Sequence, residues 1–274
     1  MDGSRRRDIN GAALEYHEEG AGEAIVFVHG APSDYRVWLP HCRELGSQYR
    51  VIAYSQRYFG RVDWDDAWPP FGVETHADDL IALCEKVGGG VHVVAWSYGG
   101  HVALTAACAR PELFASVLIY EPGVPSFVTD ANELTAFSTD ANAMFGPVFA
   151  AIAQRDYTLG VRLLLAGSGQ APDYFDSQPA SRRAVQLDNA RVLPLLLAQA
   201  APPPITCEQL RALRGKTAVA WGECTRPLFA IVSRAAARCI GGDGHVIVPG
   251  AGHMLPEERP SDFVALVRRH LTAR

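Results

Sequence analysis

The stretch that decides the fold of this chain is VVAWSYGG, residues 93–100. The apolar run before Ser97 predicts a buried strand, and the small residues after it predict a closely packed helix. A sharp turn between strand and helix lifts the serine hydroxyl off the sheet, where the first N–H groups of the helix point at the same spot. Ala95 and Gly99 are small enough for that crossing. Ser97 is therefore a candidate nucleophile.

Two other apolar runs also end in glycine-bearing turns. Residues 24–28, AIVFV, lead into HGAP at 29–32, and residues 246–248, VIV, lead into GAGH, whose last residue is His253. In an open parallel sheet, sites form beyond the carboxyl ends of the strands. We therefore expect these turns to converge with the turn at Ser97.

In this order and spacing, the motifs resemble those of the α/β-hydrolase superfamily from about Asn10 to Leu271. The matching pieces are HGAP at 29–32, RYFG at 57–60, the turn at Ser97 and GAGH at 250–253. The resemblance implies an α/β fold, with a mostly parallel central sheet, helices on both faces and an inserted helical cap. It implies a core formed by residues 1–121 and 205–274, and a cap formed by residues 122–204.

The periodicity of the chain favours the same architecture. Apolar residues at helical spacing predict a helix over 74–87, and strand patterns alternate with helix patterns along the chain. We expect an edge strand at 14–17, a solvated terminus at 5–7 and a closing helix over 260–271.

A serine hydroxyl needs a neighbouring base, and the base needs an orienting group. His253 is the candidate base, because its glycine-rich turn lets the ring reach Ser97. Members of the superfamily usually carry the acid as the Asp of a Gly-Glu-x-Asp motif, but residues 222–225 here are GECT, and Thr225 carries no charge. Glu121 directly follows the strand pattern of 117–120, and some relatives carry their acid at that place. Glu121 is therefore the expected acid, with Glu223 as the alternative.

The resemblance also places an oxyanion hole at the backbone N–H groups of Ala31 and Tyr98. Such donors stabilise the negative oxygen that develops in acyl transfer. Aromatic and methionine residues between 127 and 175 are expected to pack the cap, with a few of them facing the pocket.

Composition limits the partners, the cellular location and the cofactors that we expect for this chain. The chain has 274 residues and a net charge of −5 with mixed signs, which points to neither nucleic acid nor a membrane surface. There is no apolar run of about 18 residues and no hydrophobic signal segment at the start, so a cytoplasmic location is expected. The six scattered cysteines lack metal-site spacing and are interpreted mostly as small buried residues. No cofactor or metal is expected, and the protein is expected to act as a monomer or homodimer.

The leading hypothesis is a serine hydrolase that cleaves a carboxylic ester or lactone of an apolar or aromatic small molecule through an acyl-enzyme. Carbon–carbon bond hydrolysis of a diketone-like substrate on the same triad is the alternative. A noncatalytic ligand-binding member of the fold is a third possibility, suggested by Thr225 in place of the usual acid.

Overall fold

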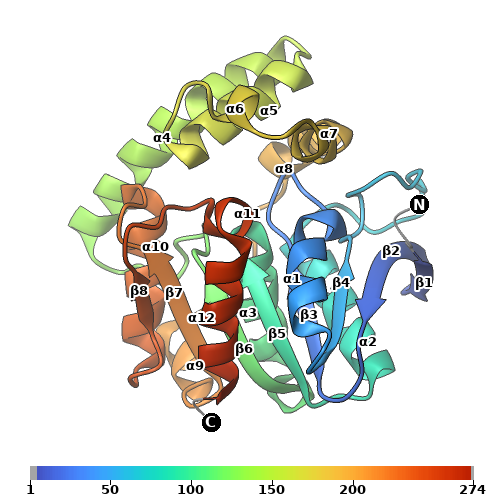
Figure 1. Ribbon diagram of the computed structural model, residues 1–274. Helices are drawn as coiled ribbons and strands as arrows, with labels where there is room; N and C mark the ends of the chain where they lie inside the picture. The colour runs from blue at the N-terminus through green and yellow to red at the C-terminus, as the bar shows by residue number, and fades with distance from the viewer. Residues whose placement is uncertain (1–4, 273–274) are drawn as a thin grey trace.

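The computed structural model describes residues 5–272, which form a central eight-stranded sheet flanked by helices (Figure 1). The strands are β1 (Arg5–Ile9), β2 (Ala12–Glu19), β3 (Ala24–Val28), β4 (Arg50–Tyr54), β5 (Val91–Trp96), β6 (Phe114–Tyr120), β7 (Thr217–Gly222) and β8 (Val246–Val248). Their order across the sheet is β1-β2-β4-β3-β5-β6-β7-β8. Pairing is antiparallel between β1 and β2 and between β2 and β4, and parallel from β4 to β8.

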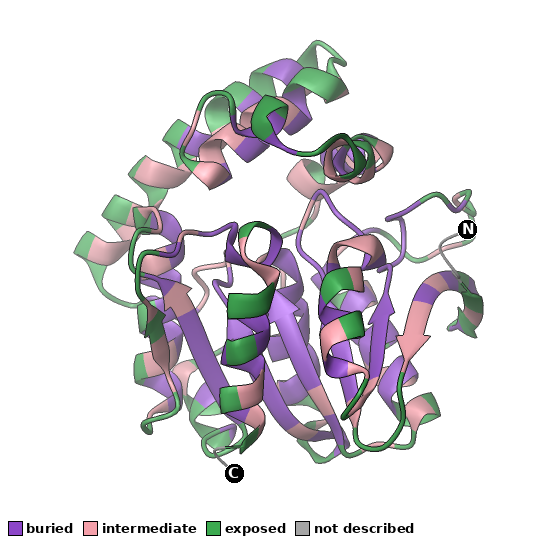
Figure 2. Ribbon diagram, in the orientation of Figure 1, coloured by how far each residue is buried: buried purple, intermediate pink, exposed green. Residues whose placement is uncertain are grey.

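Helices cover both faces of the sheet, so the central strands are buried on both sides (Figure 2). One face carries α2 (Val73–Val87), α3 (Tyr98–Ala109), α9 (Cys207–Ala212) and α10 (Pro227–Ile240). The other carries α1 (Leu39–Leu45) and α12 (Pro260–Thr272), with the short α11 (Leu255–Glu258) just before α12. Double burial explains why β3, and β6 apart from Ser116, consist of apolar residues rather than alternating ones.

Five further helices, here called the helical layer, lie across the carboxyl ends of the strands (Figure 1). They are α4 (Ala131–Ala153), α5 (Tyr157–Gly169), α6 (Tyr174–Ser177), α7 (Ala180–Asp188) and α8 (Leu193–Ala198).

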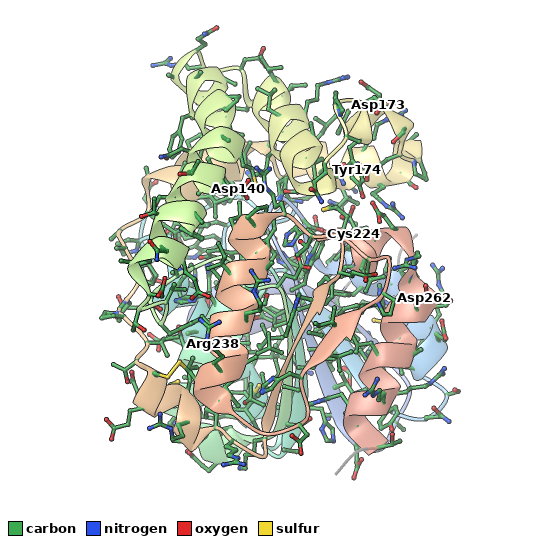
Figure 3. The ribbon with its side chains drawn as sticks, turned by 90° about the vertical axis from the view of Figure 1, so that its left-hand side faces the viewer. Asp140, Asp173, Tyr174, Cys224, Arg238 and Asp262 are labelled. Atoms are coloured by element: carbon green, nitrogen blue, oxygen red, sulfur yellow. A yellow bond between two sulfur atoms is a disulfide. The ribbon has the colours of Figure 1, made fainter. Side chains whose placement is uncertain are left out.

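Polar contacts tie the helical layer to the sheet domain. Arg226, before α10, forms an ion pair of 2.8 Å with Asp140 of α4. Gln170, after α5, donates a hydrogen bond of 2.7 Å to the carbonyl of Cys224. Figure 3 shows Asp140 on α4 above the loop that holds Cys224. The layer is thus held over the loops that follow the strands.

Several expected elements form within a residue or two of their predicted bounds. The helix predicted over 74–87 is α2, and the closing helix is α12. The strand predicted at 14–17 forms as part of β2, but its predicted position at the edge is wrong, because β1 pairs outside it. The arginine run at 5–7 belongs to β1, where the Arg7 guanidinium lies 4.9 Å from the centroid of the Tyr16 ring. Long arginine stems can cover an apolar edge while their charges stay in water.

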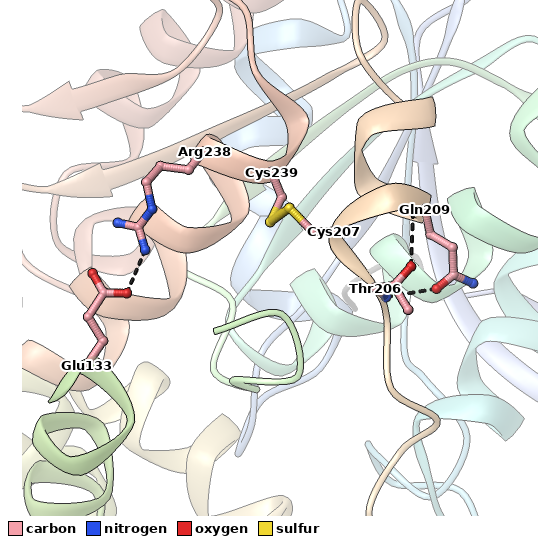
Figure 4. The surroundings of a disulfide bond; sticks show 6 residues. All are labelled: Glu133, Thr206, Cys207, Gln209, Arg238 and Cys239. Atoms are coloured by element: carbon pink, nitrogen blue, oxygen red, sulfur yellow. Dashed lines mark hydrogen bonds and ion pairs between the residues drawn. A yellow bond between two sulfur atoms is a disulfide. The ribbon is translucent and has the colours of Figure 1, made fainter. Parts of the chain in front are cut away.

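Two of the six cysteines, which the sequence analysis interpreted mostly as small buried residues, form a disulfide. Cys207, at the start of α9, forms a disulfide with Cys239 near the end of α10, across a sequence separation of 32 (Figure 4). Thr206 and Gln209 form a capping box beside it, and Arg238 pairs with Glu133 of α4 at 2.5 Å. The packing of α9 on α10 brings the two Cα atoms to 4.8 Å, which sequence spacing alone does not predict. The free thiols are those of Cys42, Cys84, Cys108 and Cys224.

Among the helices of residues 5–272, none is both long enough and apolar enough to cross a membrane.

Candidate active site

Ser97 occupies a sharp turn between β5 and α3. Its φ of 57° and ψ of −121° are rare for a residue with a side chain. Its N–H donates to the carbonyl of Tyr120 at 2.9 Å, which anchors the turn to β6. A Cβ on Gly99 would lie 2.5 Å from the carbonyl oxygen of His29, so only glycine fits there. The close crossing predicted from the small residues is confirmed.

His253 lies beside the hydroxyl of Ser97. Its Nε2 is 3.0 Å from the Ser97 Oγ, and its backbone carbonyl accepts a hydrogen bond of 3.0 Å from the Trp96 indole N–H. The Phe229 ring stacks on the imidazole with a centroid distance of 3.5 Å and an interplanar angle of 3°. Indole and phenyl together fix the ring against the nucleophile.

Glu121 completes a hydrogen-bonded chain with these two residues. Its Oε2 lies 2.7 Å from His253 Nδ1, and the residue is fully buried. The N–H of Gly222 donates to Oε1 at 2.7 Å, and the hydroxyl of Thr225 donates to Oε2 at 2.8 Å. Three groups, two donors and the imidazole, thus hold the carboxylate in one position. Thr225 therefore supports the acid from the position where the usual motif carries it.

Glu223 lies elsewhere. It is exposed, and its Oε2 accepts a hydrogen bond of 2.9 Å from the N–H of Gly250. This contact ties together the loops after β7 and β8. The structure therefore brings Glu121, and not Glu223, to His253.

The HGAP turn packs directly against Ser97. A Cβ on Gly30 would come within 2.9 Å of the Ser97 Cβ, so the turn needs glycine to approach this closely. The His29 ring accepts from the Gln56 N–H at 3.0 Å and donates to the carbonyl of Gly30 at 2.8 Å. Burial lowers the pKa of His29 to about 4, so a neutral ring holds the turn that carries Ala31.

Tyr98 is the first residue of α3, so its backbone N–H has no partner within the helix. Its side chain packs rather than lining the site: the hydroxyl lies 2.7 Å from His76 Nδ1. His76 Nε2 lies 3.0 Å from the carbonyl of Arg57, which can only accept, so Nε2 donates. Nδ1 of the neutral ring therefore accepts a hydrogen bond from the tyrosine hydroxyl. Burial lowers the pKa of His76 to about 3.

A small cavity adjoins His253. It is lined by Ala31, Pro32, Ser33, Trp96, Leu165, Ser168, His253, Met254 and Glu257. None of the aromatic residues predicted between 127 and 175 is in this set; α5 contributes Leu165 and Ser168 instead. Phe149, one of those aromatics, is 51% exposed.

Sequence reasoning missed three neighbours of the triad residues. Thr225 had a signal, because it stands where the usual motif has its acid, but it was interpreted as a loss. Phe229 and Glu257 had none, because their places depend on how α10 and α11 pack.

Among residues 5–272, there is no group of three or more His, Cys, Asp or Glu side chains that could hold a metal ion.

Comparison with known sequences gives three informative relatives. Lipase LipV of Mycobacterium tuberculosis is 25% identical over 270 residues, which cover 91% of this chain and 94% of the relative. The 2-(acetamidomethylene)succinate hydrolase of Mesorhizobium japonicum is 33% identical over 135 residues, 47% of each protein. The polyketide synthase ThaQ of Burkholderia thailandensis is 27% identical over 226 residues, 74% of this chain but 11% of that protein. The chain thus spans about a tenth of the synthase and about half of the succinate hydrolase.

Solved structures share the fold. An esterase from Thermogutta terrifontis superposes with a TM-score of 0.70 at 24% identity, covering 98% of both chains. The meta-cleavage product hydrolase CumD gives a TM-score of 0.65 at 18% identity, covering 100% of this chain and 99% of the other. The sequence model of the alpha/beta hydrolase family matches residues 25–266. The chain belongs to the alpha/beta hydrolase family.

Proposed function

We propose that this protein is a serine hydrolase that cleaves a carboxylic ester or lactone of an apolar or aromatic small molecule through an acyl-enzyme. The observation that carries the proposal is the hydrogen-bonded chain from Ser97 through His253 to the buried carboxylate of Glu121.

In the first half of the reaction, Ser97 Oγ attacks the carbonyl carbon while His253 Nε2 takes the hydroxyl proton. Glu121 accepts the Nδ1–H bond and stabilises the imidazolium that forms. The N–H groups of Ala31 and Tyr98 stabilise the oxyanion, and one such donor is typically worth about 3 kcal/mol of barrier. His253 then gives its proton to the leaving alcohol oxygen, and the acyl-enzyme remains.

In the second half, water enters and His253 takes one of its protons as the water oxygen attacks the acyl carbon. Collapse of this intermediate breaks the bond to Ser97 Oγ, which recovers its proton from His253. The carboxylic acid leaves. Trp96, Leu165 and Met254 contribute apolar atoms to the wall beside His253, which suits the carbon atoms of the acyl group next to the scissile carbonyl.

We further propose that the helical layer is a cap, spanning 122–204, which closes over the site and helps to select the substrate. Leu165 and Ser168 of α5 reach the cavity beside His253, so the layer contributes directly to its wall.

The test is labelling with a fluorophosphonate, which reacts with activated serine hydroxyls. We expect one adduct on the intact protein and none on Ser97→Ala, read by mass spectrometry, with loss of aryl-ester turnover in the same variant. Ser261→Ala, an exposed serine on α12, is the matched control and should label fully.

Equal labelling of Ser97→Ala would contradict the proposal. Efficient cleavage of a ring-cleavage diketone with negligible ester turnover would favour the carbon–carbon hydrolase instead. A protein that turns over no activated ester, and takes no label, would be a ligand-binding member of the fold.

A further inference from the structure

The cavity beside His253 has a polar side that the proposed mechanism does not use. Ser33 follows the HGAP turn, Ser168 comes from α5 and Glu257 from α11, and all three line the cavity together with Ala31 and His253. These three residues, here called the polar wall, are 2%, 6% and 3% exposed. Polar side chains this deeply buried normally have partners.

Glu257 is only partly satisfied. Its Oε2 accepts a hydrogen bond of 3.2 Å from Gln186 and lies 3.9 Å from the Arg182 Nε, too far for a hydrogen bond. The hydrogen bond from Gln186 and the approach of Arg182 both involve Oε2, and Oε1 is not among the fully buried atoms of residues 5–272 that lack a partner. Burial raises the pKa of this carboxyl to about 7. Glu257 thus brings to the cavity wall a carboxyl group with, among the described residues, a single hydrogen bond of 3.2 Å.

Ser33 supplies the second observation. Its hydroxyl is buried and, within residues 5–272, has no hydrogen-bond partner. The unpartnered hydroxyl of Ser33 and the carboxyl group of Glu257 thus line the same small cavity. Buried polar groups left unsatisfied are costly, and a bound ligand group is one way to satisfy them.

The size and charge of the cavity limit what can enter. It is small, with room on the order of one water molecule, so a ring or a long chain does not fit. The Arg182 guanidinium already faces the carboxyl of Glu257, which favours a neutral donor over an ammonium group. Ala31 and His253, two residues of the proposed site, also line the cavity, so a substrate group bound there belongs to the part of the substrate beside the scissile carbonyl.

We propose that Ser33, Ser168 and Glu257 form a subsite that binds a hydroxyl group on the acyl part of the substrate, one or two carbons from the scissile carbonyl. The substrate class is then a short hydroxyacyl ester or the corresponding lactone. This inference rests on the proposed ester hydrolysis and names its acyl specificity.

The experiment compares matched p-nitrophenyl esters: butyrate, 2-hydroxybutyrate, 3-hydroxybutyrate and 3-aminobutyrate. The quantity measured is the ratio of kcat/KM for each substituted ester to that for butyrate. Comparing this ratio between the unmodified enzyme and Glu257→Gln cancels the intrinsic reactivity of the esters. Glu258→Gln is the matched control, because Glu258 is the exposed neighbour on the same short helix.

At about pH 8, above the pKa of about 7 that burial gives Glu257, we expect the ratio for one of the two hydroxy esters to fall about tenfold or more in Glu257→Gln, because an amide oxygen is a weaker acceptor than the ionised carboxylate. The ratio should fall in Ser33→Ala as well, and stay unchanged in Glu258→Gln. Ratios that are the same in Glu257→Gln and the unmodified enzyme would overturn the subsite. A preference for the amino ester over both hydroxy esters would overturn the assignment to a neutral donor. Absence of Ser97-dependent turnover of all four esters would instead refute the proposed function itself.

Discussion

At the scale of single residues, the acid of the proposed triad is held in an uncommon way. Glu121 reaches His253 from the end of β6, and Thr225 donates a hydrogen bond to the same carboxylate oxygen from the loop after β7. Glu121 itself has a φ of 50°, which a side-chain-bearing residue seldom adopts. The hydrogen bonds from Gly222 and Thr225 fix the carboxylate beside the imidazole, and this arrangement requires the strained backbone conformation of Glu121.

The first residue-scale prediction separates the two candidate acids. Glu121→Gln should lower kcat for an aryl ester by about 10³- to 10⁴-fold, because a neutral amide neither fixes the imidazole tautomer nor stabilises the imidazolium. Glu223→Gln should keep kcat within about threefold, because Glu223 bonds only a loop N–H. Steady-state kinetics and a circular dichroism spectrum of each variant give the measurement and the folding control. The reverse order of effects would make Glu223 the acid.

The sequence could point to Ser97, His253 and Glu121 because each directly follows an apolar strand or a glycine-rich turn. Parallel strands then carry all three to the same edge. It could not identify Thr225 as a donor, since that role depends on the path of a loop that begins about a hundred residues after Glu121. It could not place Glu257 at the cavity either, because the short α11 reaches it only through packing.

At the scale of elements, local patterns predicted best where burial is continuous. The helices predicted over 74–87 and from 260 form as expected, because their apolar residues face the core. The strand at 246–248 also forms, although Ile247 is 54% exposed. Prediction failed at the periphery. The strand β1 consists largely of charged residues, and it forms by pairing with β2 rather than through its own hydrophobicity.

The disulfide between α9 and α10 gives an element-scale prediction. Closing a loop over a separation of 32 stabilises the fold by about 3–4 kcal/mol in the chain-entropy model. The double variant Cys207→Ser/Cys239→Ser should therefore lose roughly that much unfolding free energy in urea. Cys224→Ser, which removes an exposed free thiol, should lose almost none.

Alkylation tests the same bond directly. The denatured but unreduced protein should take up iodoacetamide on the four free thiols, and on all six cysteines after reduction. Six adducts without reduction would mean that the bond is absent in solution. Disulfides are rare in a reducing cytoplasm, so this count also bears on the cytoplasmic location that the sequence suggested.

At the scale of the whole molecule, the sheet and the helical layer were predictable to different degrees. The sheet follows from connection rules that leave few topologies for alternating strands and helices. The layer depends on contacts between distant segments, such as Arg226 with Asp140 and Asn189 with Asp34, which no local pattern reveals. For the same reason, a local pattern cannot tell which cap residues face the pocket: the cavity beside His253 takes Leu165 and Ser168 from α5, and none of the aromatic residues between 127 and 175.

The pH dependence of stability is a property of the whole molecule. Burial lowers the pKa values of four histidines, to about 4 for His29 and His101 and about 3 for His41 and His76. Between about pH 5 and 6.5, these rings are neutral in the folded protein but largely protonated once unfolded. Unfolding therefore takes up protons, and stability is lost as the pH falls through this window.

Glu257 acts in the opposite direction, and this gives the last prediction. Its raised pKa of about 7 keeps it protonated in the folded protein over the same window, while the unfolded chain releases the proton. The histidines outnumber it, so the unfolding free energy should still rise with pH. In Glu257→Gln the opposing contribution is gone, and the slope should steepen by up to about 1.4 kcal/mol per pH unit. Urea unfolding at several pH values between about 5 and 6.5 measures the slopes, with Glu258→Gln as control. An unchanged slope in Glu257→Gln would show that the carboxyl is already ionised in the folded protein, contrary to its burial beside His253.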